Sequence, residues 1–515
     1  MKKYLKHFQA DLSASIVVYL VALPLCLGIA LGSTAPLFSG IIAGVIGGIV
    51  VGILSGSQLS VSGPAAGLTS IVAASILNLN SYEVFLLALV IAGCIQVLLG
   101  YLKAGIIGDY IPNAVIKGML AAIGIILILK QFPHLVGYDK DYLGDENFIQ
   151  PDNENTFSEI IKSLNYFSVG AIFIGLISIL ILILFESKSI KRNKILQNVP
   201  GPLVVVLFSI LLHQIFIQYL PDFVIEKNKM VSLPIAGSLQ EFYNFFTTPD
   251  FKSFTNLGVW TTALTIALVA SLETLLSIEA VDKLDPNKRV TPTDRELKAQ
   301  GAGNIVSGML GGLPMTSVIV RSSANVNAGA QTKVSAILHG ILLLLSVIFI
   351  PYLINQIPLS SLAAILIYTG YKLAKVPLFV EHYKKGLDQF IPFCITILSI
   401  LFSDLLIGIG IGILTGIFFI LRTNFKSSVL LIKDNDHYMI RLRKDVSFLN
   451  KPIIKNKLEE IPEHSFLIID ASKTAFIDKD VIDVIREFKK QSVIKNIKVD
   501  LKTNPNNSFH SLLLN

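Results

Sequence analysis

The sequence predicts an all-α polytopic membrane protein with 14 transmembrane segments in two inverted seven-span repeats, followed by a small α/β domain. Three observations lead to this fold class. The 515 residues are 52% hydrophobic and 15% charged, whereas soluble domains carry about 25% charged residues. Apolar runs of span length recur up to about residue 430. Two short Gly/Pro-interrupted stretches occupy matching places in the two halves, which is typical of a transporter binding site.

A membrane span needs about 20 predominantly apolar residues. Clear candidates lie near residues 12–32, 37–54, 83–101, 113–131, 166–186, 199–219, 257–279, 334–354, 358–372, 389–403 and 404–421. Three weaker segments, which are rich in glycine or polar residues, bring the predicted total to 14: residues 60–77, 295–311 and 314–330. An even number of spans places both chain termini on the same side of the membrane.

The loop charges predict the orientation of these spans. Lysine and arginine gather in the loops 188–194, 282–298 and 371–389, which share a side with the basic residues 1–7 if the chain has 14 spans. The loop 133–165 is instead acidic. Because cytoplasmic loops carry the excess of basic residues, we expect both termini in the cytoplasm, at a bacterial-type plasma (inner) membrane. The basic loops also explain the net charge of +7 without a nucleic-acid partner.

An internal repeat supports the inverted arrangement. Ile49–Gly56 resembles Ile305–Gly312, and each leads into a short segment with proline and hydroxyl residues, Ser60–Ser70 in the first copy and Gly311–Gly329 in the second. The copies are seven predicted spans apart, so they have opposite orientations in the membrane. Paired broken segments of this kind predict the third and tenth helices to be discontinuous and to line a binding site.

Each broken segment contains a proline, Pro64 or Pro314, which suits the first turn of a half helix because its missing N–H is not needed there. The unpaired N–H groups and positive dipole ends would then face a cavity near the middle of the membrane and bind a small anion. Otherwise the prolines merely kink packed helices. The predicted substrate-binding residues are Ser62, Gly63, Pro64, Ala65, Ala66, Thr69, Thr316, Ser317, Val318 and Arg321.

Two charged residues stand out in predicted spans, where ionised side chains are costly. Arg321 either supplies positive charge to the site or pairs with a nearby acid, and Glu273 is its obvious partner. Glu273 and Ser277 are four residues apart, so they share one helix face. Together they predict a Na⁺ site completed by backbone carbonyls, or Glu273 alone carries a proton; a purely structural Glu273–Arg321 pair is the alternative. Glu279 is expected at the membrane interface.

The sequence shows no pattern of covalent catalysis, so we predict no catalytic residues and no enzyme activity. The spacings of His134, His213 and His339 do not match a metal site, and Ser/His/Asp and phosphate-loop motifs are not seen. Apart from a coupling ion, no cofactor is expected.

From about Leu431 the composition changes to that of a soluble α/β domain. Met439–Phe448, Ser465–Asp470 and Ile497–Leu501 have strand patterns. Lys451–Ile461 and Lys479–Ser492 have helical patterns. The predicted boundaries are therefore 1–430 for the transmembrane domain, with repeats at about 1–219 and 250–425, and 431–515 for the C-terminal domain.

These residues resemble the sulfate permease (SulP) family of anion transporters over nearly the whole chain. The resemblance rests on Asn304–Pro314 with Arg321 and Asn325, on Ser271–Ser277 in the eighth predicted span, and on Val61–Gly67 in the third. It implies a core domain of spans 1–4 and 8–11 that moves against a gate domain in an elevator-like step. The anion would sit between the N-termini of the third and tenth spans, and members are commonly homodimers in the lipid membrane.

The Ser-Gly-Pro motif and the acid–hydroxyl pair are similar to the sodium-dependent bicarbonate branch of that family. In that branch the acid is often Asp, so Glu273 leaves proton coupling open. The C-terminal domain resembles STAS domains, with Asp470–Asp480 covering their signature. Lys479 and Asp480 stand where related domains place a phosphorylatable serine, which argues against a phosphoserine switch.

We therefore expect a secondary active transporter for a small inorganic oxyanion of the sulfate or bicarbonate class, coupled to Na⁺ or H⁺. Alternatives are an anion exchanger, a channel-like anion pathway, and a dicarboxylate or nucleobase carrier of related fold. Arg321 facing the site would be unhelpful for a neutral base. A membrane-anchored sensor would not need two matched broken helices.

Overall fold

The computed structural model describes residues 7–139, 148, 154–187, 199–235, 237–427, 429–443, 445–474 and 476–503. It divides into a larger unit that ends at Ile413 and a smaller unit that begins at Leu414 and also takes in Gly386–Gln389. The loop 188–194, residues 1–6 and much of the acidic loop 133–165 lie outside the described residues. The predicted orientation in the membrane therefore remains a prediction.

The larger unit is helical, and a helix lies at each of the predicted spans. In the first half these are α2 (Phe8–Gly32), α3 (Leu37–Ile46) continued by the π-helical η1 (Gly47–Val51) and α4 (Gly52–Leu54), η2 (Ala66–Leu68) with α5 (Thr69–Leu79), α6 (Tyr82–Tyr101), α7 (Asn113–Leu135), α9 (Val169–Glu186) and α11 (Gly201–Tyr219). In the second half they are α13 (Leu257–Leu284), α14 (Thr293–Leu310), α15 (Ile319–Asn327), α16 (Val334–Phe349), α18 (Leu359–Leu373), α20 (Leu387–Phe402) and α21 (Leu405–Ser427). The residues of α21 after Ile413 belong to the smaller unit.

Short elements connect them: η3 (Ala104–Tyr110), α8 (Thr156–Ser163), η5 (Pro221–Phe223), η6 (Lys227–Lys229), α12 (Leu239–Tyr243), η7 (Phe251–Thr255), α17 (Pro351–Ile354) and α19 (Val376–Lys384). Among the described residues, nine helical stretches have the length and apolarity of a membrane span, and three shorter helices are also apolar. The structure is thus that of a polytopic membrane protein. The total of 14 crossings remains a prediction, because α14 and α15 are too polar to count by hydropathy alone.

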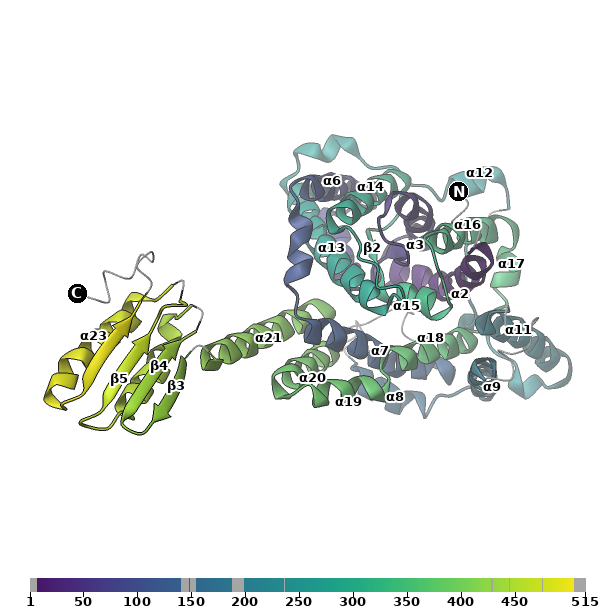
Figure 1. Cartoon of the computed structure of the whole chain (residues 1–515). Coiled ribbons are helices and arrows are strands. Elements are labelled where there is room, and N and C mark those ends of the chain that lie inside the picture. Colours follow the sequence, from purple (N-terminus) through teal and green to yellow (C-terminus); the bar gives the residue numbers. More distant parts are fainter. Residues whose placement is uncertain are drawn as a thin grey trace. The chain divides into compact units, whose positions relative to one another are not determined.

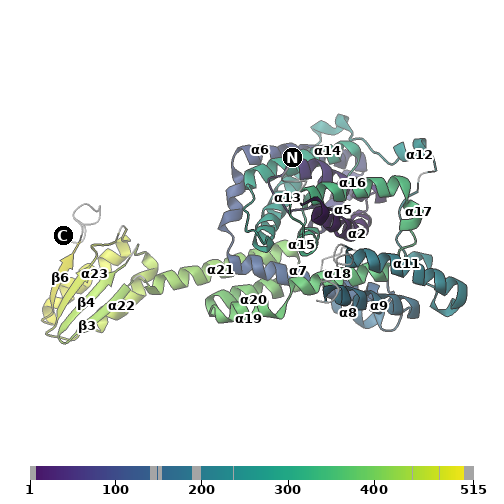
Figure 2. The ribbon, with the colours of Figure 1, turned by 45° about the vertical axis from the view of Figure 1, so that its right-hand side comes forward.

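The broken segments lie in the middle of a core group of helices, α2–α6 and α13–α16. Figure 1 shows β2 (Met315–Ser317) and α15 surrounded by α2, α3, α13 and α16. The turned view of Figure 2 keeps α15 beside α2 and α13. A second group, which we call the gate group, contains α7, α9, α11 and α18, with α7 packed on α18 and α9 packed on α11.

Glycines allow close approach of helices that come from different halves of the chain. α3 and η1 pack on α16, and α6 packs on α14. Across these contacts, and across the α7–α18 contact, glycine backbones face each other at Gly48–Gly340, Gly93–Gly301 and Gly124–Gly370. A methyl group on any of these residues would lie about 2.5–2.9 Å from the opposite backbone, so small residues are required there. This two-fold pattern agrees with the predicted inverted repeats.

The smaller unit is a four-stranded sheet with helices. Its strands are β3 (Val429–Asp434), β4 (His437–Leu442), β5 (Phe466–Asp470) and β6 (Lys498–Lys502), in the order β3-β4-β5-β6. β3 and β4 are antiparallel, whereas β4, β5 and β6 are parallel. The helices are η8 (Phe448–Asn450), α22 (Lys451–Glu459) and α23 (Lys479–Ile494). β3 was not predicted, because its apolar residues directly continue the apolar run of α21.

A carboxylate at the end of β5 stabilises this unit. Asp470 Oδ1 accepts hydrogen bonds from Ser472 N at 3.1 Å and Ser472 Oγ at 2.6 Å, and Oδ2 accepts one from Arg441 Nε at 3.2 Å. Burial opposes ionisation, but the bonds from Ser472 and Arg441 outweigh it and hold the pKa of Asp470 below its ordinary value of 3.8. The stabilisation is therefore complete above that value and is lost as the pH falls through the lowered pKa.

We expect Asp470→Asn to destabilise the C-terminal unit by on the order of 1 kcal/mol at pH 7. The difference from wild type should shrink as the pH falls below about 4. Hydrogen exchange of the β5 backbone in the full-length protein measures this effect. Asp500→Asn is the matched control, because Asp500 is exposed on the neighbouring strand β6. Equal protection of β5 in wild type and Asp470→Asn at pH 7 would contradict the role of the carboxylate.

Candidate functional site

The two broken segments meet each other directly inside the core group. β1 (Ser62–Pro64) and β2 form an antiparallel ladder in which Ser62 pairs with Ser317 and Pro64 with Met315. All six strand residues are buried. η2 and α5 follow β1, and α15 follows β2. The two segments predicted to be inverted partners therefore form one continuous structure.

The sequence predicted that the two prolines occupy the first turn of a helix, and this prediction is wrong. Pro64 is the last residue of β1, and Pro314 immediately precedes β2. They do not kink packed helices either. The fixed φ of proline also suits extended backbone at the end of a short strand, and the neighbouring Gly63 lets β1 approach other groups closely. The helices begin further along, η2 two residues after Pro64 and α15 five residues after Pro314.

The start of α15 presents unused backbone donors. Val318 N bonds Val61 O at 3.0 Å, and Ser322 N makes the first helical bond, to Val318 O, at 3.0 Å. The N–H groups of Ile319, Val320 and Arg321 are thus the ones that a helix leaves without an intrahelical acceptor. They are directed beyond the helix start, where the dipole is positive.

A polar stripe on α14 holds both strands in place. Gln300 Nε2 donates to Ser62 Oγ at 2.5 Å. Asn304 accepts from Met315 N at 2.8 Å and donates to Met315 O at 3.1 Å. Glu296, one turn before Gln300, accepts from Ser55 Oγ at 2.5 Å. Sequence reasoning missed this stripe, although its spacing of four residues was a usable signal.

The four predicted hydroxyl residues, Ser62, Thr69, Thr316 and Ser317, line neither of the two cavities described below. Ser62 bonds Gln300, and Ser317 Oγ lies 2.5 Å from Ser60 Oγ, so both stabilise the ladder rather than face a cavity. Thr316 Oγ1 donates to the carbonyl of Ser317 at 3.3 Å. Thr69 Oγ1 is buried and makes no hydrogen bond within the described part of the chain.

Arg321 is completely buried and lies against β1. A Cβ at Gly63 would lie 2.9 Å from Arg321 Cζ, so the guanidinium packs on the backbone of that strand. None of its three nitrogen atoms bonds to an oxygen or nitrogen atom of a residue that the structure describes, and the neighbouring Cys26 thiol is only a weak acceptor. The predicted pair between Arg321 and Glu273 is therefore not formed. A buried charge without compensation costs several kcal/mol, which makes this guanidinium a candidate ligand for an anion.

Glu273 lies on the other side of the same segment. A Cβ at Gly67 would lie 3.4 Å from each of its carboxylate oxygens, so the carboxylate borders η2. Glu273 is 6% exposed and Ser277 is 5% exposed. Both line a cavity of about 20 Å³, together with Met119 and Ile123 of α7. We call it the acidic cavity.

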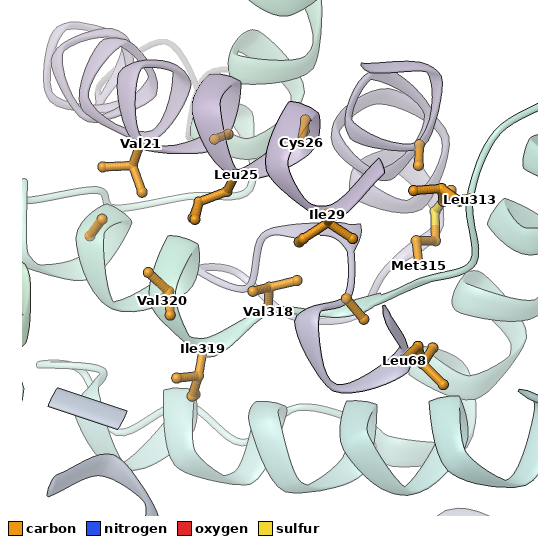
Figure 3. Close-up of a cluster of buried hydrophobic side chains, with 14 of the residues drawn as sticks. Val21, Leu25, Cys26, Ile29, Leu68, Leu313, Met315, Val318, Ile319 and Val320 are labelled. Carbon is orange, nitrogen blue, oxygen red and sulfur yellow. The ribbon is translucent and has the colours of Figure 1, made fainter. Parts of the chain in front are cut away.

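A second cavity of about 20 Å³ lies next to the first and is lined by Arg321, by Leu25 and Ile29 of α2, and by Lys130 and Gln131 of α7. We call it the basic cavity. The two cavities share three wall residues, Ala66, Val318 and Val320. Figure 3 shows Val318 and Val320 on the side of Ile29 and Leu25, and Ile319 pointing to the opposite side.

The geometry therefore separates an acid from a base across the start of one helix. Of the ten predicted substrate-binding residues, Ala66, Val318 and Arg321 line the basic cavity and the other seven line neither cavity. Glu273 and Ser277 line the acidic cavity. Each cavity holds about one water molecule. A polyatomic anion requires the α7 wall to move outward.

The acidic cavity suits a monovalent cation better than a multiply ligated metal. No cluster of three or more His, Cys, Asp or Glu side chains that could hold a metal ion occurs in the part of the chain that the structure describes. One carboxylate and one hydroxyl, completed by backbone carbonyls, are hard oxygen donors of the kind that hold Na⁺ in transporters.

Because Gly63 touches the guanidinium, we expect Gly63→Ala to displace Arg321 and to weaken anion binding about tenfold. The protein should still fold, since the clash involves the far end of a flexible side chain. The measurement is the anion concentration that half-saturates uptake. Gly410→Ala is the control, because a Cβ there meets nothing within 4 Å. Wild-type affinity in Gly63→Ala would show that the position of the guanidinium does not matter.

Residues 8–398 match the model of the sulfate permease family. "Putative sulfate transporter YvdB" of Bacillus subtilis (strain 168) is 30% identical over 446 residues, which cover 86% of this chain and 79% of the relative. The solved structure of SLC26A9 aligns with a TM-score of 0.66 at 16% identity, over 97% of this chain and 84% of its own. The transmembrane domain of a cyanobacterium bicarbonate transporter, BicA, aligns with a TM-score of 0.53 at 21% identity, over 80% and 97%. The two structures share the fold described above.

Proposed function

Since this chain belongs to the sulfate permease family and is a membrane anion transporter rather than an enzyme, we propose that it is a secondary active transporter. Its substrate is a small inorganic oxyanion of the sulfate or bicarbonate class, and its driving ion is Na⁺ or H⁺. The observation that carries this proposal is the placement of the basic and acidic cavities on the two sides of one helix start.

The anion binds in the basic cavity. The N–H groups at the start of α15 donate to its oxygens, and the buried guanidinium of Arg321 supplies the positive charge. Charge-assisted hydrogen bonds of this type are worth about 1.5–3 kcal/mol each. The bound anion also relieves the cost of burying Arg321 without a partner.

The coupling cation binds at Glu273 and Ser277. When Glu273 is ionised and holds no coupling ion, its negative charge repels an anion in the neighbouring cavity. A cation or proton bound to Glu273 removes that repulsion. The anion in turn offsets the field of Arg321, which otherwise repels the cation. Each ligand thus favours the other, and such couplings are typically 1–3 kcal/mol, or about 5–150-fold in affinity.

The composition of the cavity walls supports an alternating-access mechanism. α2, α13 and α15 of the core group form one side of the cavities, and α7 of the gate group forms the other. Movement of the core group along α7 in an elevator-like step would carry the loaded site from one face of the membrane to the other. The small size of both cavities argues against a continuous channel.

The protein acts as a homodimer in the lipid of a bacterial-type plasma membrane, with both termini in the cytoplasm. Its C-terminal unit is a STAS-like domain: the predicted helices and the three predicted strands occur, with β3 added at one edge.

Uptake by the purified protein in liposomes tests the proposed function. Labelled sulfate and bicarbonate are supplied in turn, and an inward Na⁺ gradient and a pH gradient are imposed separately. We expect one oxyanion to accumulate at least about tenfold faster with one of the gradients than without. Uptake that responds to neither gradient would indicate exchange or a channel-like pathway instead.

A further inference from the structure

α7 contributes two polar side chains to the wall of the basic cavity that faces Arg321. Lys130 is 6% exposed and Gln131 is 3% exposed. They line the cavity together with Ile126 and Leu127 of the same helix. The spacing of these four residues places them on one face of α7, which also carries His134 one turn beyond Lys130.

The ionisable side chains that line the basic cavity are both cationic. They are Arg321 from the core group and Lys130 from the gate group. The carboxylate of Glu273 lines the neighbouring cavity instead. Two cations that line one cavity from different groups of helices favour an anion between them, because the anion is attracted to both.

Gln131 offers a further group that points to a ligand. Its Oε1 is buried and makes no hydrogen bond to any residue that the structure describes. An amide can turn by half a revolution, so the same side chain can present its NH₂ group to the cavity. A buried polar group left in this way is costly unless a ligand or water satisfies it.

We propose that Lys130 and Gln131 form the second half of the anion site and bind the oxyanion from the gate group while Arg321 and the start of α15 bind it from the core group. This inference rests on the proposed function and extends it. A polyatomic oxyanion has acceptors on several sides, so it can bridge the two walls.

The division of the site between two groups of helices gives Lys130 a role in release. When the core group moves along α7, the anion travels with Arg321 and leaves Lys130 behind. Its affinity then falls at the point where it must leave. Lys130 therefore raises the affinity for the anion while the site opens to one face of the membrane, and it no longer contacts the anion when the site opens to the other face.

The test is a comparison of Lys130→Gln and Lys130→Arg with wild type in the liposome uptake assay. We expect Lys130→Gln to raise the KM for the transported oxyanion about tenfold or more while kcat changes less than about threefold. Lys130→Arg keeps the charge and should stay within about threefold of wild type. Lys117→Gln, on the same helix but outside both cavities, should match wild type.

A structural role for Lys130 predicts a different result. Lys130→Gln would then lower the melting temperature and the amount of folded protein, with no selective change in KM, and Lys130→Arg would not rescue it. Gln131→Glu provides an independent variant, since it adds a negative charge to the cavity at nearly constant size. It should raise KM at least tenfold if the anion contacts this wall.

The same assay separates the Lys130–Gln131 half site from the transport activity itself. If wild type takes up oxyanion and both Lys130→Gln and Gln131→Glu keep its KM, the gate-side half site does not exist, although the transporter assignment stands. If wild type takes up neither sulfate nor bicarbonate, the proposed function fails and this site fails with it.

Discussion

Replacing Arg321 by methionine is expected to weaken anion binding by about 100-fold or more and, at the same time, to raise the melting temperature in anion-free buffer. The first effect follows from the loss of charge-assisted hydrogen bonds, which together contribute about 3 kcal/mol. The second follows because the guanidinium is fully buried and none of its nitrogen atoms bonds to an oxygen or nitrogen atom of a described residue. An apolar side chain of similar length removes that cost.

The opposite signs of the two effects separate a ligand from a structural residue. Ligand-binding groups are often held in environments that lower stability, whereas a structural arginine would lose stability and function together. Arg295→Met is the matched control, because Arg295 is exposed on α14 and its Nε donates to the carbonyl of Leu54 at 2.9 Å. It should leave anion affinity within about threefold of wild type. A lower melting temperature for Arg321→Met would make Arg321 a structural residue.

Glu273→Gln is expected to abolish the response of uptake to the driving gradient. Glutamine keeps the size of glutamate and can still form hydrogen bonds, but it cannot carry a negative charge or a transported proton. Gradient-driven uptake should fall by about 100-fold. Under proton coupling the variant imitates the protonated carboxyl, so anion binding and exchange should persist. Under Na⁺ coupling the variant should bind the anion equally well at low and at high Na⁺, because its neutral side chain neither repels the anion nor holds the cation.

The control for this variant lies on the same helix. Glu279 is on α13 as well, but its side chain is 21% exposed and pairs with Lys283 at 2.9 Å. Surface pairs of this kind contribute little, so Glu279→Gln should transport as wild type does. If Glu273→Gln kept the full gradient response, the coupling ion would have to bind elsewhere.

The main architecture was predictable because it depends on local patterns. Apolar length located the helices, and the Gly/Pro-interrupted segments located β1, β2 and the start of α15. Arg321 and Glu273 were recognisable because ionisable groups are rare in apolar surroundings. The structure places both beside the broken segments, as expected.

The partners of these residues were not predictable, because they come from distant parts of the chain. The ladder between β1 and β2 joins residues that are 251–255 positions apart, and it draws Pro64 into a strand instead of a helix. The same ladder places Arg321 against Gly63 and Glu273 against Gly67, on separate sides. The expected pair between the two charges therefore does not form.

Two further features were hidden by their sequence context. Glu296 is close to Asp294, Arg295 and Lys298, so the start of α14 has the composition of a charged loop, although one face of the helix is buried. Lys130 follows an apolar run near the predicted end of a span and has the pattern of an interfacial residue. Its place in the basic cavity depends on how α7 packs against α2 and α15, which no local pattern reveals.

The measurement that tests the central claim most directly is the dissociation constant of the anion for purified wild-type protein, determined with and without Na⁺ and at two pH values. A site in which Arg321 holds the anion and Glu273 holds the cation across one helix start requires reciprocal coupling. We expect saturating Na⁺, or the lower pH, to tighten anion binding at least about fivefold. A dissociation constant that is the same under all four conditions would contradict the coupled pair of cavities.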